Sequence, residues 1–249
     1  MMRLAVGAAL AALWSATAVA AELKVLSAGA VEPGLHKVVD LFNAKTGHDV
    51  KIQFNTAPQI AKRLEDGYVA DVLIAPPGAL DNYIKAGKVG ADGRILVGRV
   101  GAGIVVRPDA PVPDVKTVEA LKQAVLAADS IVYNTASTGI YLEKLFERLG
   151  IGAQIKAKTT RYPNGDAVMQ HVIKGKGKEL GFGAITEIKM FEAKGSLKLV
   201  GPLPAQVQNY TNYGAALMAN APAPDAAKAF LAFMASPEAK QAFVAAGVD

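Results

Sequence analysis

The side chains best suited to catalysis or metal binding are few and lie far apart in the sequence. The three histidines are His36, His48 and His171, and they show neither the i, i+4 pairing nor the neighbouring carboxylate pattern of a zinc site. Cysteine is absent, so the chain has no disulfide and no lipid-attachment site. We therefore expect neither a metal nor a cofactor.

Nucleophilic catalysis has little support in the sequence. Ser27 and Ser137 could in principle join the histidines in a hydrolase site. The chain contains nothing like the Gly-x-Ser-x-Gly turn that presents the nucleophilic serine in many hydrolases. An exported hydrolase remains an alternative, but we expect a protein that is not an enzyme.

Backbone groups offer a clearer chemistry in residues 23–47, LKVLSAGAVEPGLHKVVDLFNAKTG. An apolar strand, Lys24–Ala28, is followed by a turn at Gly29 and by a helix that accepts Pro33 in its first turn and stops at Gly47. The first N–H groups of a helix have no partner within it, so they point at whatever lies above the sheet edge. We place one half of a ligand site there.

The same order of strand, turn and helix recurs in the next fifty residues. Strands are predicted at Val50–Phe54 and Val72–Ala75, and prolines mark the helix starts that follow them. Thr56 is suited to cap the first of these helices. Strands that alternate with short helices indicate a mostly parallel sheet covered on both faces. These residues therefore predict one α/β lobe.

Residues 94–107, RILVGRVGAGIVVR, are longer than the strands around them and contain three glycines. We interpret them as a strand that leaves the first lobe, a crossing eased by glycine, and a strand that enters a second lobe. Beyond them the α/β pattern restarts, with strands predicted at 130–133, 155–160 and 180–185. Asp166 is predicted to cap a helix over 167–174. A strand at 210–218 suits a return crossing, and two last helices complete the first lobe.

These elements predict two lobes, residues 21–97 with 220–249 and residues 98–219, that enclose a cleft. Clefts between domains are preferred sites for small molecules. Both lobes aim strand ends and helix starts inward, so the cleft should be rich in backbone N–H groups and small hydroxyl groups. Such a site suits a small oxygen-rich solute, and we expect hinge closure around it.

Residues 1–20 predict a cleaved secretory signal. Arg3 precedes an apolar run that ends in Ala18-Val19-Ala20, the small-x-small pattern of a signal-peptidase site. The run is shorter than the ~20 residues that a membrane span needs, and no basic residues follow it, which disfavours a membrane anchor. We therefore expect a soluble mature protein in the periplasm.

The charge of the chain gives no indication of a nucleic-acid partner. The sequence has 27 Lys and Arg against 22 Asp and Glu, a formal net charge of +5. The basic residues are scattered, and the densest run, Lys174–Lys178, is interrupted by glycines. A nucleic-acid surface needs clustered basic residues with aromatics or a reading helix. We interpret these charges as a solvated surface.

Four segments carry a resemblance to a known family: LSAGAVEPGL, ADVLIAP, STGIYLEKLFERLG and ASPEAKQAF. Together with the order of elements, they resemble the periplasmic molybdate-binding protein family, within the type II periplasmic binding proteins. The resemblance covers essentially the whole mature chain. It implies a two-lobed α/β fold and a monomeric receptor that hands its solute to a membrane-embedded ABC permease. A periplasmic sensor subunit with the same fold is an alternative.

The resemblance also implies a ligand site, whose side chains differ here from those of the family. Molybdate binders place a serine at the first two strand-to-helix turns, where this chain has Ala30 and Ala57, and a tyrosine where it has Ala184. What persists is mainly backbone and small side chains. The expected ligand-binding residues are therefore Ala30, Val31, Thr56, Ala57, Ser137, Thr138 and Ala184.

These replacements remove hydrogen-bond donors and leave room. Each donor is worth roughly 0.5–1.5 kcal/mol or more to a charged acceptor, so losing several would weaken the binding of a tetrahedral oxyanion by orders of magnitude. We expect a larger organic solute, most simply a carboxylate. A molybdate- or tungstate-type oxyanion is the alternative.

Three charged residues complete the expected site. Arg161 is predicted near the end of a strand of the second lobe and is suited to bidentate pairing with a carboxylate, although a salt bridge is the alternative. Glu32 and Asp166 are predicted at helix starts that face the cleft. They either cap these helices and pair with their dipoles, or face a solute that carries an amine.

Overall fold

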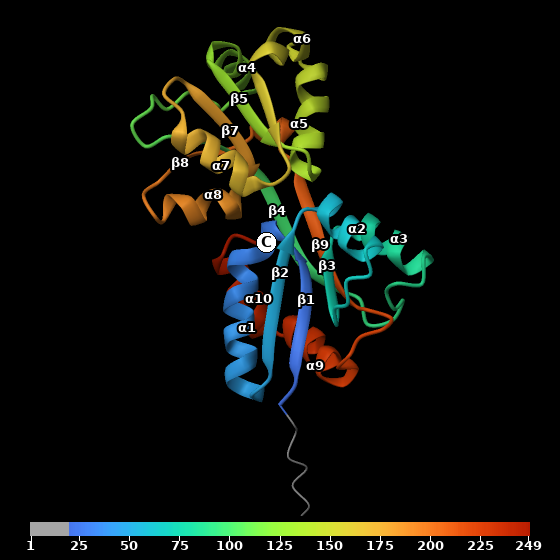
Figure 1. Ribbon diagram of the computed structural model, residues 1–249. Coiled ribbons are helices and arrows are strands. Elements are labelled where there is room, and N and C mark those ends of the chain that lie inside the picture. Colours follow the sequence, from blue (N-terminus) through green and yellow to red (C-terminus); the bar gives the residue numbers. More distant parts are fainter. Residues whose placement is uncertain (1–19) are drawn as a thin grey trace, which may run out of the picture.

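The computed structural model describes residues 20–249 and shows two lobes joined by two strands (Figure 1). The signal predicted at residues 1–20 lies outside the described part of the chain, Ala20 excepted. Within residues 20–249 no helix is long and apolar enough to cross a membrane. The two connecting strands are β4 (Ile95–Val106) and β9 (Tyr210–Leu217), which pair in antiparallel fashion. The predicted two-lobed α/β fold is confirmed.

Lobe 1 is built from strands that each lead into a helix. β1 (Glu22–Ala28) pairs in parallel with both β2 (Asp49–Asn55) and β3 (Val72–Ala75). Each helix that follows accepts a proline in its first turn. In order, these elements are the 3-10 turn η1 (Gly29–Val31) with α1 (Glu32–Thr46), α2 (Ala57–Glu65) and α3 (Pro77–Lys85).

Two helices at the C-terminus complete lobe 1. α9 (Pro224–Met234) and α10 (Pro237–Ala245) lie with α1 on one face of the sheet, and α2 and α3 cover the other (Figure 1). Gly34 of α1 lies against Phe243 of α10, because a Cβ at this glycine would be 2.6 Å from the ring. Both faces of the sheet are therefore buried, and the helix starts are left at one end of it.

Lobe 2 repeats this plan around a second sheet. Its central strand β5 (Ser130–Asn134) pairs in parallel with β6 (Thr159–Tyr162) and β7 (Glu179–Ala184). β4 pairs with β7 and with β8 (Lys198–Pro202), a strand that the sequence did not predict. The helices are α4 (Val118–Ala127), α5 (Ser137–Arg148), α6 (Gly152–Ile155), α7 (Gly165–Lys174) and α8 (Ile185–Glu192).

The first crossing is one continuous strand and not two. β4 pairs with β9 over residues 95–101 and with β7 over residues 102–105. Its glycines produce a bulge between Leu96 and Gly98 without ending the strand. At Gly98 a Cβ would lie 2.8 Å from the backbone of Asp249, so the glycine lets the C-terminus pack there. Because both sheets share β4, the lobe boundaries at residues 97/98 and 219/220 stay a prediction.

Two local predictions in lobe 2 were wrong. The strand expected at 155–160 begins only at Thr159, because residues 152–158 form short helical turns. The cap of α7 is Asn164, whose Oδ1 accepts the N–H of Ala167 at 2.9 Å, and not Asp166. Asp166 is therefore free of a capping role and stands in the first turn of the helix.

Candidate functional site

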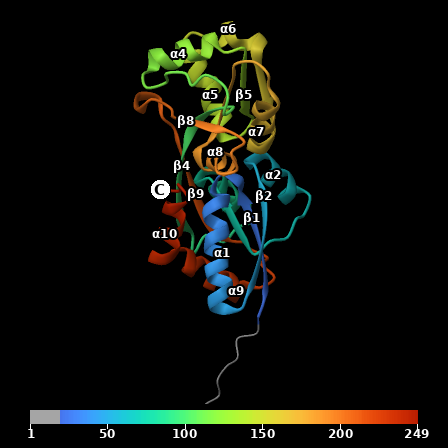
Figure 2. The ribbon, with the colours of Figure 1, turned by 90° about the vertical axis from the view of Figure 1, so that its left-hand side faces the viewer.

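The starts of several helices meet in a small hollow between the two lobes. The hollow has a volume of about 40 Å³ and takes its walls from both lobes and from β9. α8 lies above the start of α1 (Figure 2), and Glu187 of α8 lines the hollow. The lining residues are Ala28, Gly29, Ala30, Asn55, Thr56, Ala57, Pro76, Asn134, Ala136, Ser137, Thr138, Ala184, Glu187 and Tyr213.

On the lobe 1 side, the backbone at the end of β1 forms the first wall. Ala30 lines the hollow, and its carbonyl oxygen accepts a 2.6 Å hydrogen bond from the hydroxyl of Thr186 on α8. This buried bond joins lobe 1 to lobe 2. Val31 does not line the hollow, because its side chain is fully buried in the apolar core beneath α1.

The end of β2 and the start of α2 form the second wall. Thr56 is the N-cap residue of α2, and its N–H donates to Oε1 of Gln59 at 2.9 Å. Beside it, Oδ1 of Asn55 is buried and has no hydrogen-bond partner within residues 20–249. Buried polar atoms are normally paired. Asn55 is therefore an unused acceptor at the edge of the hollow.

In lobe 2 the start of α5 is held open toward the hollow. Oδ1 of Asn134, at the end of β5, accepts the N–H groups of Ala136 at 3.0 Å and Gly139 at 3.1 Å. Gly139 is needed here because a Cβ would lie 1.7 Å from the carbonyl oxygen of Asn134. The first-turn N–H groups and hydroxyls of Ser137 and Thr138 remain for a ligand.

Glu187 and Tyr213 line the hollow, although sequence reasoning missed both. Burial raises the pKa of Glu187 to about 7, and the nearby Glu32 and Asp166 carboxylates contribute. Burial also raises the pKa of Tyr213, and the charge of Glu187 adds to this effect. Glu187 could have been found, because it stands in the first turn of a helix that follows a strand, as Glu32 does. Tyr213 carries no such signal.

A larger chamber of about 330 Å³ adjoins the hollow and shares Gly29, Asn55, Thr56 and Glu187 with it. Both Glu32 and Asp166 line this chamber and not the hollow itself. Glu32 also lies 3.6 Å from Nε2 of His36. The other lining residues are Phe54, Gln59, Asn164, Gly165, Met190, Phe191 and Lys194.

Arg161 lies away from both cavities. Its Nη1 is 2.9 Å from Oε1 of Glu143, and its guanidinium is 5.4 Å from the ring of Tyr133. Arg161 and Tyr133 are partners in the register of β6 and β5, and both line a separate cavity of lobe 2. Because side chains alternate across a sheet, the side chain of Arg161 points away from the cleft. Its position is that of a salt bridge with Glu143, which was the alternative interpretation of this residue.

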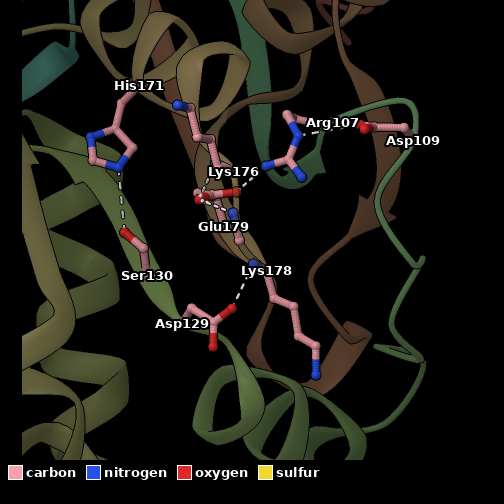
Figure 3. A network of polar contacts seen from close by, with 9 residues as sticks. Arg107, Asp109, Asp129, Ser130, His171, Lys176, Lys178 and Glu179 are labelled. Atoms are coloured by element: carbon pink, nitrogen blue, oxygen red, sulfur yellow. Dashed lines mark hydrogen bonds and ion pairs between the residues drawn. The ribbon is translucent and has the colours of Figure 1, made fainter.

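The three histidines have separate local partners. Nδ1 of His48 accepts the N–H of Ala21 at 3.0 Å. His171 lies 3.4 Å from the hydroxyl of Ser130 (Figure 3) and 2.9 Å from that of Tyr162. Within residues 20–249 no group of three His, Cys, Asp or Glu side chains is arranged to hold a metal ion.

The two lobes, the two connecting strands and the hollow between the lobes are the features of the type II periplasmic binding protein fold. Residues 23–249 match the family described as bacterial extracellular solute-binding protein, and the chain belongs to that family. The resemblance to molybdate-binding proteins is also confirmed at the level of the fold. The Azotobacter vinelandii periplasmic molybdate-binding protein has a TM-score of 0.75 and 19% identity, covering 91% of this chain and 98% of that one.

Two further proteins are similar over most of their length. The sulfate-binding protein SubI from Mycobacterium tuberculosis H37Rv has a TM-score of 0.74 and 18% identity, covering 91% of this chain and 86% of that one. An aconitate isomerase from a Pseudomonas species is 32% identical over 234 residues, which is 91% of this chain and 87% of that protein. The family is therefore one of binding proteins, and one relative bears the name of an enzyme.

Proposed function

We propose that this protein is the periplasmic receptor of an ABC importer and captures a small organic carboxylate between its lobes. In this proposal a signal sequence at residues 1–20 exports the chain, and a membrane permease receives the solute. The observation that carries the ligand class is the shape and lining of the site. Helix starts and small hydroxyl groups surround a hollow suited to one oxygen-rich head group, and the adjoining chamber has room for the rest of an organic molecule.

The alanines at the turns support this choice over an inorganic oxyanion. Ala30, Ala57 and Ala184 all line the hollow. They stand at the positions where the molybdate-binding proteins that this chain resembles have hydroxyl groups. Hydrogen bonds to charged groups are worth roughly 1.5–3 kcal/mol each. A compact tetrahedral anion would lose these donors, whereas a carboxylate can use the N–H groups of two helix starts. The name of the aconitate isomerase relative is consistent with a carboxylate ligand.

A thermal-shift panel tests the ligand class. The purified protein is heated with carboxylates (cis-aconitate, trans-aconitate, citrate, succinate), with molybdate, tungstate and sulfate, and with the diamine putrescine. A ligand at 100 times its Kd adds about 2.7 kcal/mol to the apparent stability. We expect stabilisation by one or more carboxylates. Stabilisation by inorganic oxyanions alone, or by the amine alone, would refute the proposal.

Hinge closure is tested through the bond between Thr186 and Ala30. Thr186→Val removes the hydroxyl that donates across the lobes and should cost the closed form about 1 kcal/mol. Carboxylate affinity should then fall about fivefold, and small-angle scattering should show less compaction at a given ligand concentration. Thr186→Ser keeps the hydroxyl and should behave like the wild type. Equal compaction in all three proteins would contradict hinge closure through this contact.

A second candidate function is isomerisation of an unsaturated carboxylate such as aconitate. Two observations favour it: the relative of that name, and Glu187, a half-buried acid in the hollow whose pKa of about 7 suits proton transfer near neutral pH. The Glu187 carboxylate would remove a proton from the methylene carbon next to the double bond. It would return that proton to the carbon at the other end of the allylic system. The double bond then moves by one position and can form in either the cis or the trans geometry.

Proton NMR of cis-aconitate incubated with the protein tests this candidate. Conversion to trans-aconitate is expected with the wild type, and Glu187→Gln should abolish it while the variant still binds the substrate. The matched control is Glu192→Gln, an exposed glutamate on the same helix. No conversion above the rate in buffer would leave only the binding function.

A further inference from the structure

The hollow contains an acid but no base. Of the residues 20–249, no lysine, arginine or histidine lines it, whereas Glu187 does. The negative head group of a solute must therefore sit beside this carboxyl group with only helix starts and neutral side chains to offset its charge. Two adjacent carboxylates strongly disfavour one another when both are ionised. Either the solute is not an anion, or Glu187 is not one when the solute is bound.

The carboxyl group of Glu187 is wedged between the two lobes. A Cβ on Gly29 of lobe 1 would lie 3.3 Å from its Oε1, and a Cβ on Gly165 of lobe 2 would lie 2.2 Å from its Oε2. Both glycines thus leave just enough space for the two oxygens. The carboxyl group is held at the point where the hollow and the chamber meet.

The groups around Glu187 increase the cost of its negative charge. Glu32 on α1 and Asp166 on α7 lie near it on opposite lobes, and Lys194 lines the chamber but not the hollow. Burial and these two carboxylates together raise the pKa of Glu187 to about 7. A bound anion would act in the same direction. The titratable and charged groups that face this cluster are Glu32 with its partner His36, Asp166, Tyr213 and Lys194.

We propose that Glu187 is protonated in the closed, loaded protein and donates its O–H to a carboxylate oxygen of the solute. Binding at alkaline pH therefore takes up a proton from solvent, and Glu187 becomes a determinant of specificity for hydrogen-bond-accepting anions. This inference rests on the proposed carboxylate function. It also distinguishes binding from isomerisation, because a protonated Glu187 cannot serve as the base. As the pH falls, carboxylate binding should strengthen, whereas base-catalysed isomerisation should slow.

Isothermal titration calorimetry of the mature protein with trans-aconitate and citrate tests the proposal. Titrations at pH 8 in two buffers of different ionisation enthalpy measure the number of protons taken up. We expect an uptake approaching one proton for the wild type, and an affinity that falls about tenfold per pH unit above pH 8. Glu187→Gln, whose amide can donate without titrating, should bind within about tenfold of the wild type with no uptake and no pH dependence.

The control variant is Glu192→Gln, which should keep both the proton uptake and the pH dependence. A wild type that binds these carboxylates with no proton uptake and equal affinity from pH 6 to pH 9 would overturn this inference and leave the proposed function intact. A loss of more than a hundredfold in Glu187→Gln would also overturn it, because the ionised carboxylate would then be required. Failure of both probes to bind the wild type, with putrescine binding instead, would refute the inference and the carboxylate function together.

Discussion

Lobe 2 contains two glutamates near the two ends of β7. One is surrounded by groups that stabilise its negative charge, and the other by groups that destabilise it. Glu179 begins the strand and is only 8% exposed, but it forms an ion pair with Arg107 and accepts the N–H groups of Lys176 at 3.0 Å and Gly177 at 2.8 Å (Figure 3). Glu187 follows the strand in the first turn of α8 and faces two other carboxylates.

The difference between them shows that partners, and not burial alone, decide the charge of a buried acid. Burial by itself would raise the pKa of Glu179, but the backbone N–H groups and Arg107 hold that pKa below its ordinary value. For Glu187 burial raises the pKa and the neighbouring carboxylates raise it further, and the single hydrogen bond from the backbone of Ala184 offsets only part of this. One site is built to keep a negative charge that organises a loop, and the other is built to hold a proton.

The largest expected loss of stability comes from removing Glu179, the glutamate whose charge is paired. Glu179→Ala leaves Arg107 without its buried partner and two N–H groups without an acceptor, and should reduce the free energy of unfolding by about 3–5 kcal/mol. Urea denaturation at pH 7 measures this loss. The matched control is Asp109→Ala, because Asp109 pairs with the same arginine but is exposed, and it should cost less than about 1 kcal/mol. Equal losses would contradict the contrast between the two sites.

The stability contributed by Glu187 should depend on pH, because the pKa of this residue is raised in the folded protein by burial and by the neighbouring carboxylates, which outweigh the hydrogen bond from the backbone of Ala184. From the ordinary pKa of 4.5 up to about 7, folded Glu187 holds a proton that the unfolded chain has released. The free energy of unfolding should therefore fall as the pH rises through this window. Glu187→Gln should lack this fall and be more stable than the wild type above pH 7, by at most about 3 kcal/mol. Parallel stability curves for the two proteins from pH 4 to pH 8 would argue against this assignment.

Each glutamate abuts a glycine, which allows a finer comparison. A Cβ at Gly175 would lie 2.2 Å from Cδ of Glu179, and a Cβ at Gly165 would lie 2.2 Å from Oε2 of Glu187. Gly175→Ala should cost about 1–3 kcal/mol of stability, because Glu179 is held in place by its partners. Gly165→Ala should cost a similar amount, because the carboxyl group of Glu187 is also confined by Gly29 on its other side, and the added Cβ should displace that carboxyl group from its place between the hollow and the chamber.

The Gly165→Ala variant should therefore weaken trans-aconitate or citrate binding about tenfold in calorimetry, whereas Gly175→Ala should leave affinity unchanged. If the two variants lost affinity equally, the hollow would not be the place where the solute contacts Glu187.

The smallest effect is expected at Arg161. This residue pairs with Glu143 in a separate cavity, so Arg161→Ala should change carboxylate affinity by less than twofold and stability by no more than about 1 kcal/mol. Calorimetry with trans-aconitate and citrate measures the first value. A tenfold loss of affinity would restore Arg161 as the charged partner of the solute.

Much of the fold and part of the candidate site could be predicted from local patterns. Pro33 in the first turn of α1 and Gly47 at its end, with a φ of 72°, stand where the sequence places them. Ala30, Ala57 and Ser137 line the hollow, because each follows a strand whose end faces the other lobe. Turn and helix-start chemistry depends on residues a few positions apart, and so it can be read from the chain alone.

The tertiary structure decided what depends on contacts between distant segments. The side-chain direction of Arg161 is set by its pairing with β5, the burial of Glu187 by Gly29 of the other lobe, and the place of Tyr213 by the path of β9. None of these has a local signature, since the partners lie tens of residues away or more. The sequence by itself therefore determined a two-lobed fold with alanines at its turns, and the packing of the lobes decided which acid lines the hollow.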